Sequence, residues 1–182
     1  MKDSFLEKFP IIKGNKENPY LIIFDAYCGQ GKSYISKIIS KYDNSIIMNN
    51  DEVRSWLDNY ENNNELLYEL QQYRLELLLK NNNSCIMDSC SCINWDRKKK
   101  ILDKLGYKYY IIRLTCSDNT IKERINNRTY GNDNYSKGTY EDYIWQKENV
   151  PRIDDSLIDY TIDTEKNIDE QVKDFINKYN LK

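Results

Sequence analysis

The chain has 182 residues, of which 31% are charged and 40% are hydrophobic, and its formal net charge at pH 7 is −2. This length fits one domain with a full hydrophobic core, and the slightly acidic balance argues against a surface that holds nucleic acid by bulk electrostatic attraction. No stretch is apolar for long enough to cross a bilayer, and the first eight residues lack the hydrophobic region of a signal peptide. We therefore expect a cytoplasmic protein with no membrane partner.

The cysteines do not have the spacing of a metal site. They are Cys28, Cys85, Cys90, Cys92 and Cys116, an odd number, and the chain contains no histidine. Zinc would therefore need four thiolates at finger-like spacing, which is absent. We expect reduced thiols, most of them buried.

Expected strands and helices alternate along the chain. Residues 1–19 are polar and are expected to form an arm or a short helix, which places the main domain at residues 20–182. Apolar runs predict strands over residues 20–24, 45–48, 85–87, 107–115 and 157–162. Apolar residues at helical spacing predict a helix that ends at about residue 42, a second that starts near residue 51, and a long one that ends at the turn of residues 81–83. Further helices are predicted over residues 94–105, 120–127, 139–149 and 168–179. The expected N-caps are Asn94, Ser117 or Asp118, and Asn167, with Gly106 as a helix stop.

This alternation predicts an α/β fold in which helices cover both faces of a five-stranded parallel sheet. Ligands of such sheets gather at the carboxyl ends of the strands, so polar residues there are the candidates for function.

The segment from Ala26 to Ser33, Ala-Tyr-Cys-Gly-Gln-Gly-Lys-Ser, follows the first strand and opens a helix. That is the setting of a phosphate-binding P-loop, or Walker A motif, and it favours this interpretation over a plain glycine-rich turn. Glycines let backbone amides approach phosphates, the lysine adds a charge, and the serine hydroxyl can reach Mg²⁺. The expected nucleotide-binding residues are therefore Cys28, Gly29, Gln30, Gly31, Lys32 and Ser33, with ATP and Mg²⁺ as cofactors, although Ala26 replaces the usual first glycine.

Carboxylates follow the second and third strands. Asp51 and Arg54 lie three apart on one helical face and suit a general base and a cation for the acceptor. The alternative is that Asp51 only caps its helix. Asp88-Ser89 ends an apolar run and resembles a Walker B site that binds Mg²⁺ and substrate; the alternative is a turn aspartate.

Two arginines precede a polar stretch. Arg124 and Arg128 are four apart and lead into residues 129–138, so they suit a mobile lid over about residues 124–140 that closes on phosphates. The alternative is ordinary surface arginines. The basic run at residues 97–100 is interpreted as a solvated face, because four successive helical residues point all round the helix.

The order of these motifs resembles that of the 5′-hydroxyl polynucleotide kinases and their P-loop kinase relatives, over roughly residues 20–179. The motifs are, in chain order, the P-loop, Asp51-x-x-Arg54, Asp88-Ser89 followed by Asn94-x-Asp96-Arg97, and Arg124-x-x-x-Arg128. The resemblance implies the P-loop NTPase fold with the strand order 2-3-1-4-5 of nucleoside-phosphate-kinase-like proteins. It also implies a hydroxyl acceptor, and the 5′ end of a nucleic acid is the acceptor of the family.

The resemblance further implies roles for single residues. Asp51 would accept the proton of the acceptor hydroxyl, and Arg54 would bind the phosphate on its 3′ side. Arg128 would bridge the donor phosphates, which makes Lys32, Asp51 and Arg128 the expected catalytic residues. Arg124 would flank the adenine, against the loop near Asp163 and Thr164.

Other functions remain open. Nothing matches the Asp-x-Asp-x-Thr motif of the phosphatase domain that many polynucleotide kinases carry, and related P-loop kinases act on sugars, antibiotics, nucleotide-sugars or modified bases. A GTPase switch would show Asp-x-x-Gly after Asp88 and a complete Asn-Lys-x-Asp, and an ATPase would place Glu where Ser89 stands. A degenerate partner-binding domain is disfavoured by the intact Lys32 and Ser33.

Overall fold

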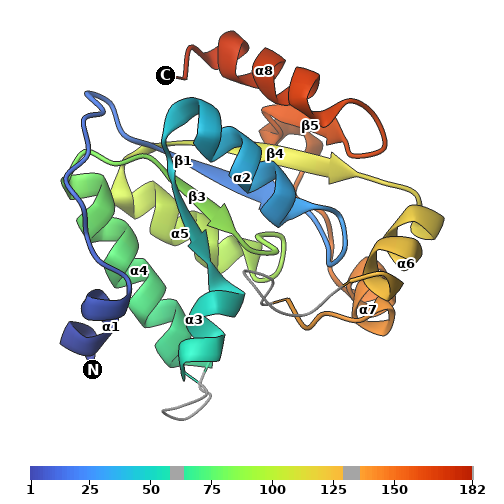
Figure 1. Cartoon of the computed structure of the whole chain (residues 1–182), viewed down its shortest axis with the longest axis horizontal. Coiled ribbons are helices and arrows are strands. Elements are labelled where there is room, and N and C mark those ends of the chain that lie inside the picture. The colour runs from blue at the N-terminus through green and yellow to red at the C-terminus, as the bar shows by residue number, and fades with distance from the viewer. Residues whose placement is uncertain (58–63, 129–135, 182) are drawn as a thin grey trace.

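The computed structural model describes residues 1–57, 64–128 and 136–181. One parallel sheet has the order β2-β3-β1-β4-β5, which confirms the predicted topology (Figure 1). Its strands are β1 (Tyr20–Asp25), β2 (Ile46–Asn49), β3 (Cys85–Asp88), β4 (Lys108–Thr115) and β5 (Tyr160–Asp163). The helices are α1 (Lys2–Lys8), α2 (Lys32–Asp43), α3 (Asn50–Leu57), α4 (Asn64–Lys80), α5 (Trp95–Leu105), α6 (Asp118–Asn126), α7 (Tyr140–Asn149) and α8 (Ile168–Tyr179).

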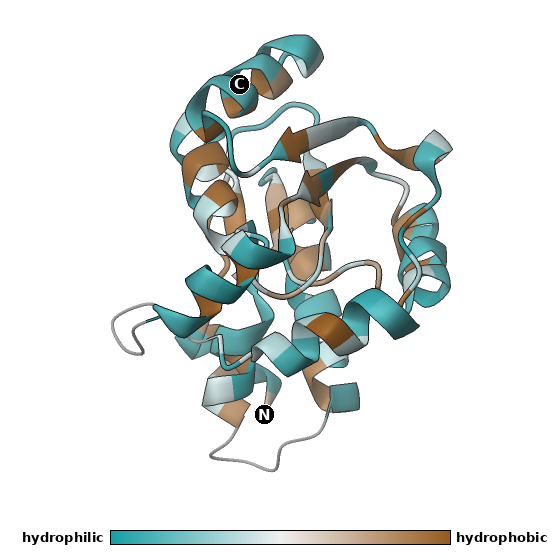
Figure 2. Cartoon of the chain, turned by 90° about the vertical axis from the view of Figure 1, so that its right-hand side faces the viewer, coloured by the Kyte–Doolittle hydropathy of each residue, from teal (hydrophilic) through white to brown (hydrophobic). Residues whose placement is uncertain are grey.

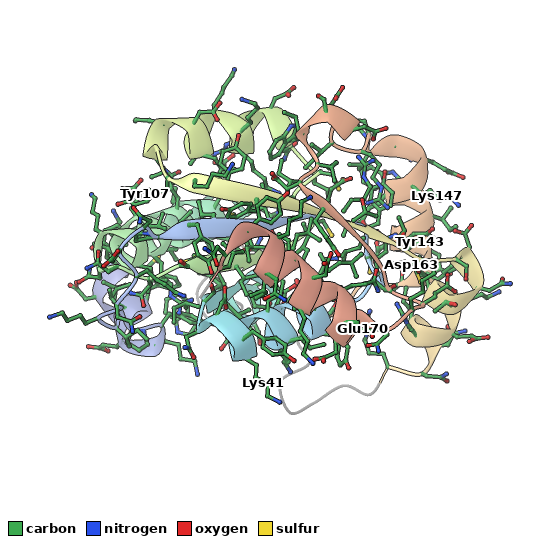
Figure 3. The ribbon with its side chains drawn as sticks, turned by 90° about the horizontal axis from the view of Figure 1, so that it is seen from above. Lys41, Tyr107, Tyr143, Lys147, Asp163 and Glu170 are labelled. Carbon is green, nitrogen blue, oxygen red and sulfur yellow. The ribbon has the colours of Figure 1, made fainter. Side chains whose placement is uncertain are left out.

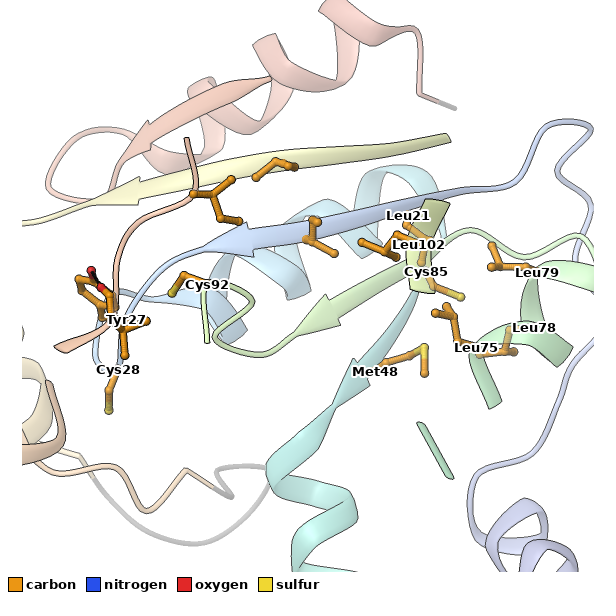
Figure 4. Close-up of a cluster of buried hydrophobic side chains, with 14 of the residues drawn as sticks. Leu21, Tyr27, Cys28, Met48, Leu75, Leu78, Leu79, Cys85, Cys92 and Leu102 are labelled. Carbon is orange, nitrogen blue, oxygen red and sulfur yellow. Dashed lines mark hydrogen bonds between the residues drawn. The ribbon is translucent and has the colours of Figure 1, made fainter. Parts of the chain in front are cut away.

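Two apolar clusters hold the three layers together. All six residues of the central strand β1 are buried, and its side chains alternate between the faces of the sheet. On one face Ile22 and Phe24 pack with residues of α2 and α8. On the other, Leu21 packs with the leucines of α4 and with Leu102 of α5 (Figure 4). Hydrophobic segments therefore lie on the strands and the inner sides of the helices, as the hydropathy colours indicate (Figure 2).

The N-terminal segment packs on the domain. Phe5 of α1 is 0% exposed and belongs to a third apolar cluster, with Val53 and Leu57 of α3 and Leu67 and Leu70 of α4 among its members. The backbone that follows α1 hydrogen-bonds to the turn after α4, since Gly14 N donates to Asn81 O at 2.8 Å. Residues 1–19 thus include the short helix that the sequence allowed, fixed along α4.

Two local expectations were wrong. Residues 155–157 form a 3-10 helix, capped by Asp154, and β5 begins only at Tyr160. The adjacent Asp159 carboxylate accepts from Ile111 N, so a side chain replaces a strand pairing there. Asn94 precedes α5 in a left-handed conformation, with φ of 57°, and its side chain caps no amide. The caps at Ser117 and Asn167 are confirmed, as is the stop at Gly106.

The state of the cysteines agrees with the expectation of reduced, mostly buried thiols. All five cysteines are free, and three of them are buried. Over residues 1–57, 64–128 and 136–181, no helix is both long and apolar enough to cross a membrane.

Candidate active site

The P-loop connects β1 to α2. Gly29 and Gly31 have φ of 78° and 90°, a region that residues with a Cβ rarely adopt. A Cβ on Gly29 would also come within 2.7 Å of Cγ2 of Ile121. The predicted need for glycine at these two positions is therefore confirmed, and the loop leads into the N-terminus of α2 at Lys32.

A network of charged side chains supports the P-loop on the side that faces the protein interior. The Asp25 side chain is 0% exposed and pairs with Arg113, whose Nε lies 2.6 Å from Asp25 Oδ2. Arg152 donates to Asp25 O at 2.7 Å and to Gln30 Oε1 at 3.0 Å, and its guanidinium lies 4.1 Å from the centre of the Tyr27 ring. Gln30 Oε1 also accepts from Tyr27 N at 2.7 Å. The Gln30 side chain thus points into the protein, which leaves only its backbone for a nucleotide.

Helix α7 is attached to the same loop. Tyr27 Oη donates to Val150 O at 2.5 Å, directly after α7, and Cys28 N donates to Gln146 Oε1 at 2.8 Å. At its other side α7 is tied to α6, because Tyr143 and Lys147 both hydrogen-bond to Asp118. Tyr143 and Lys147 are labelled in Figure 3. The P-loop, α6 and α7 therefore form one connected unit.

Lys32 lies at the centre of the site. Its Nζ donates to Tyr27 O at 2.8 Å. Burial disfavours the charged form, but neighbouring groups, above all Cys90 and Asp88, outweigh burial and raise the pKa of Lys32. The lysine is therefore held as a cation, as the binding of phosphates requires.

Asp88 ends β3 opposite Asn49, whose Nδ2 donates to Asp88 Oδ2 at 2.8 Å. Burial raises the pKa of Asp88, and hydrogen bonding with the Ser33 hydroxyl partly offsets that rise. A serine hydroxyl beside a carboxylate gives the oxygen donors that Mg²⁺ prefers. The described part of the chain holds no group of three or more His, Cys, Asp or Glu side chains that suits a metal. The oxygens of Ser33 and Asp88 fit a magnesium that takes its other ligands from substrate phosphates and water.

Asn49, rather than Asp51, caps α3. Asn49 Oδ1 accepts from Asp51 N at 2.8 Å and from Glu52 N at 3.0 Å. The Asp51 carboxylate instead accepts from Arg54 Nη1 at 2.6 Å, in a pair that is about one-third exposed, 37% for Asp51 and 38% for Arg54. Asn49 thus takes the capping role that was the alternative for Asp51. The Asp51 carboxylate lines the cavity described below.

The two arginines lie on the other side of the loop. Arg124 donates to Thr164 Oγ1 at 2.9 Å and to Thr164 O at 2.7 Å, which agrees with its expected place beside this loop. Arg128 donates to Ser136 Oγ and to Gly138 O, both at 3.1 Å. Residues 129–135 of the predicted lid lie outside the described residues. The described residues that follow them contact Arg128 through Ser136 and Gly138.

These side chains meet in one cavity of about 710 Å³ at the carboxyl ends of the strands. Of the predicted site residues, all line it except Gln30: Cys28, Gly29, Gly31, Lys32, Ser33, Asp51, Arg54, Asp88, Ser89, Arg124 and Arg128. Seven lysine or arginine and three aspartate side chains are among the lining residues, so the cavity suits anionic ligands. Its volume lies in the range of pockets that hold small molecules.

The family model AAA_18, described as an AAA domain, matches residues 22–146. The chain belongs to this family. No curated protein matches the sequence. The AAA_18 region begins within β1 and ends at Gln146, so it contains the P-loop, Asp51, Asp88 and the arginines.

Solved structures share the fold of this AAA_18 protein. The APS kinase CysC of Mycobacterium tuberculosis, in complex with AMPPNP and APS, is 15% identical with a TM-score of 0.62, over 90% of this chain and 98% of that chain. A gluconokinase from Sinorhizobium meliloti 1021 is 14% identical with a TM-score of 0.57, over 86% and 87%. The shikimate kinase from Acinetobacter baumannii, in complex with shikimate, is 13% identical with a TM-score of 0.54, over 100% of both chains. The chain thus has the P-loop kinase fold.

Sequence reasoning missed Lys98 of this AAA_18 chain. The run at residues 97–100 is largely a solvated face, since Arg97 pairs with Glu65 and Lys99 with Asp103. Lys98 instead lines the cavity and donates to Cys90 O at 3.0 Å. The available signal was that Ile101, Leu102 and Leu105 follow Lys98 at helical spacing, which puts it on the inner side of α5.

Proposed function

We propose that this protein is an ATP-dependent kinase that transfers a phosphoryl group to an alcohol of a small molecule. The observation that carries the proposal is Asp51, whose carboxylate is not needed as a helix cap and lines the same cavity as the P-loop. A carboxylate beside a bound hydroxyl can take its proton as the phosphoryl group is attacked. The neighbours named above, an APS kinase, a gluconokinase and a shikimate kinase, support a small acceptor.

The reaction balances with the residues present. The acceptor oxygen forms a bond to the γ-phosphorus of ATP, the bond from that phosphorus to the β,γ-bridging oxygen breaks, and ADP leaves. The acceptor proton passes to Asp51. Lys32 and Arg128 stabilise the charge on the transferring group, and Arg124 orients the adenine beside Thr164. When bound between Ser33 and Asp88, Mg²⁺ would neutralise phosphate charge.

Transfer to an alcohol is favoured over transfer to water. ATPases place a glutamate after the Walker B aspartate to activate water, whereas Ser89 occupies that position here. The base candidate, Asp51, comes from the helix after the neighbouring strand β2. This arrangement leaves space in the cavity between Asp51 and the P-loop for an acceptor.

A second candidate acceptor is a nucleoside 3′-phosphate or the 5′-hydroxyl end of a polynucleotide. The specific observation in its favour is Arg54, a cation held beside Asp51 in the cavity. A phosphate next to the reacting sugar could take Arg54 from Asp51. The negative net charge limits this mode to local contacts with few phosphates.

One assay tests both proposals. Labelled ATP is offered with a panel of small alcohols, hydroxy acids and sugars, and with 5′-hydroxyl oligonucleotides and nucleoside 3′-phosphates. Transfer to a small alcohol is expected. Preferred transfer to the 3′-phosphate compounds, lost in Arg54→Ala, would establish the second candidate. ATP hydrolysis at one rate whether or not any alcohol is present would contradict both.

A further inference from the structure

A side chamber of about 90 Å³ adjoins the main cavity between α4 and α5. The two spaces share Asn50, Tyr68, Ser89 and Lys98 as lining residues. The other walls of the chamber combine four apolar side chains with polar and charged ones. The apolar ones are Leu75, Met87, Ile101 and Leu102, and the polar and charged ones are Glu69, Gln71, Gln72, Asn94 and Arg97. Because the chamber lies beside Asn50 and Ser89, it is on the acceptor side of the cavity, away from Arg124.

Two buried polar atoms of the chamber have no hydrogen-bond partner among the residues that the structure describes. The side chain of Gln71 is 6% exposed and its Oε1 accepts no hydrogen bond. Its Nε2 donates to Asn49 O at 3.2 Å and to Asn50 Oδ1 at 3.0 Å, and the backbone oxygen fixes which end of the amide is the donor. Ser89 is 8% exposed, and its Oγ is also unpartnered.

These two atoms stand apart from the other unpartnered ones. Among the described residues, Ser36, Arg74 and Ser91 also have an unpartnered buried atom, but none of the three lines either cavity. Buried polar groups are nearly always hydrogen-bonded, so an open acceptor and an open hydroxyl in a chamber indicate a ligand that completes them.

Lys98 adds a cation to the same wall. Its Nζ makes one hydrogen bond, to Cys90 O, which leaves donors for a ligand. Burial lowers the pKa of Lys98 to about 8, and nearby Lys32 acts in the same direction, against Cys90 and Cys92. Desolvation disfavours the charged form of this amine, and an anion bound beside it would stabilise that form.

We propose that this chamber binds the end of the acceptor that lies away from the reacting hydroxyl, and that the acceptor is a small alcohol with an anionic group. The anion binds Lys98, and a hydroxyl or N–H of the same molecule donates to Gln71 Oε1. Ser89 Oγ bonds to the molecule between these two points. This inference rests on the proposed function and specifies its acceptor.

The test compares hydroxy acids with their uncharged amides as acceptors, beginning with gluconate and gluconamide, and shikimate and its amide. The variants are Lys98→Met and, as a matched control, Lys100→Met, an exposed position on the same helix. A charge-assisted hydrogen bond predicts a rise of about 10- to 100-fold in the KM of the acid in Lys98→Met, with the KM of ATP little changed. Lys100→Met leaves both unchanged.

Ser89→Ala provides a variant that should fold normally, because Ser89 Oγ has no protein partner to lose. It is expected to raise the acceptor KM several-fold and to leave the melting temperature unchanged. Equal use of acids and amides by the wild type, or equal effects of Lys98→Met and Lys100→Met on the acid, would overturn the inference. A rise in the KM of ATP alone in Lys98→Met would also overturn it, since the lysine would then serve the donor.

Calorimetric binding of the same acids and amides without ATP separates this inference from the proposed function. Binding of an acid that requires Lys98, with no phosphoryl transfer to any alcohol, would support the chamber and contradict the kinase. Transfer to an acid whose binding ignores Lys98 would support the kinase and contradict the chamber.

Discussion

The donor and acceptor sides of the cavity differ in how their polar groups are satisfied. On the donor side, Asp25, Gln30 and Lys32 are hydrogen-bonded to neighbouring parts of the protein. On the acceptor side, Gln71 and Ser89 each keep a buried atom without a partner. Under our proposals the donor side is a support whose polar groups are already paired before a nucleotide binds, whereas the acceptor side would be completed by its ligand.

The first prediction removes the charge at the centre of the donor side. Lys32→Ala should lower phosphoryl transfer by at least about 10³-fold, because no other side chain is held at that point of the P-loop. Labelled-ATP assays measure the rate of transfer. Chelation of divalent cations by EDTA should abolish the activity of the wild type as well. Lys41→Ala, at an exposed position on the same helix (Figure 3), is the control. Near-normal turnover of Lys32→Ala would refute the P-loop interpretation.

The second prediction tests the boundary between the two sides. Asp51→Asn should lower kcat by about 10²- to 10⁴-fold and keep ATP affinity, since a general base is lost. Its thermal stability should hardly change, because Asn49 caps α3. Asn49→Ala is the matched variant and should lower stability by about 1 kcal/mol. A loss of stability in Asp51→Asn with unchanged kcat would return Asp51 to a structural role.

The third prediction distinguishes two arginines within the donor side. Arg128→Ala should lower kcat by about 10²-fold and affect ATP binding less, if its charge acts mainly in the transition state. Arg124→Ala should instead weaken ATP binding, because the guanidinium is fixed to Thr164 beside the expected adenine. Steady-state kinetics with calorimetric ATP binding measure both. Small and equal effects would leave both as surface arginines.

The smallest predicted effect is a pH dependence on the acceptor side. An anionic acceptor binds protonated Lys98, whose pKa is about 8, so the acceptor KM should rise above pH 8, approaching tenfold per pH unit. Lys98→Arg should show no such rise, since arginine stays charged. The titratable groups that act on the pKa of Lys98 are Lys32, Cys90 and Cys92, and Glu69 and Arg97 line the same chamber. The pKa of Cys92 is raised to about 11. Cys90→Ser and Glu69→Gln are the controls. A rise of the same size in Lys98→Arg would contradict the assignment.

The same lysine predicts the sign of a stability change. Its pKa in the folded protein lies below the ordinary lysine value of 10.5, so the unfolded chain binds more protons between pH 8 and 10.5. The destabilisation due to Lys98 is fully present below pH 8 and is relieved as the pH rises through this interval. Urea titrations measure the free energy of unfolding of the wild type and of Lys98→Met. The difference between the two proteins should therefore be smaller at pH 9.5 than at pH 7.

The sequence predicted those parts of the site that are formed by residues close to one another in the chain. The sheet order was implied by the resemblance to P-loop kinases, the P-loop and the pairing of Asp51 with Arg54 follow from short motifs, and the alternation of strands and helices follows from periodicity. The support of the P-loop does not, because Arg152 and Asp25 are 127 residues apart and meet only in the fold. Gln71 is one polar residue within a long helix, and only its burial in the folded chamber identifies it.

The attachment of α7 to the P-loop also gives the protein an optical property. Trp145 is 58% exposed and precedes Gln146, whose side chain accepts from the Cys28 amide. A nucleotide bound to this amide, as proposed, would release Gln146, and the indole beside it would then change its surroundings. Trp56 belongs to the cluster of α1, α3 and α4 on the acceptor side, with its ring 5.6 Å from that of Phe5. Of the three tryptophans, Trp145 and Trp56 are therefore the intrinsic fluorophores with which nucleotide and acceptor binding could be followed in unlabelled protein.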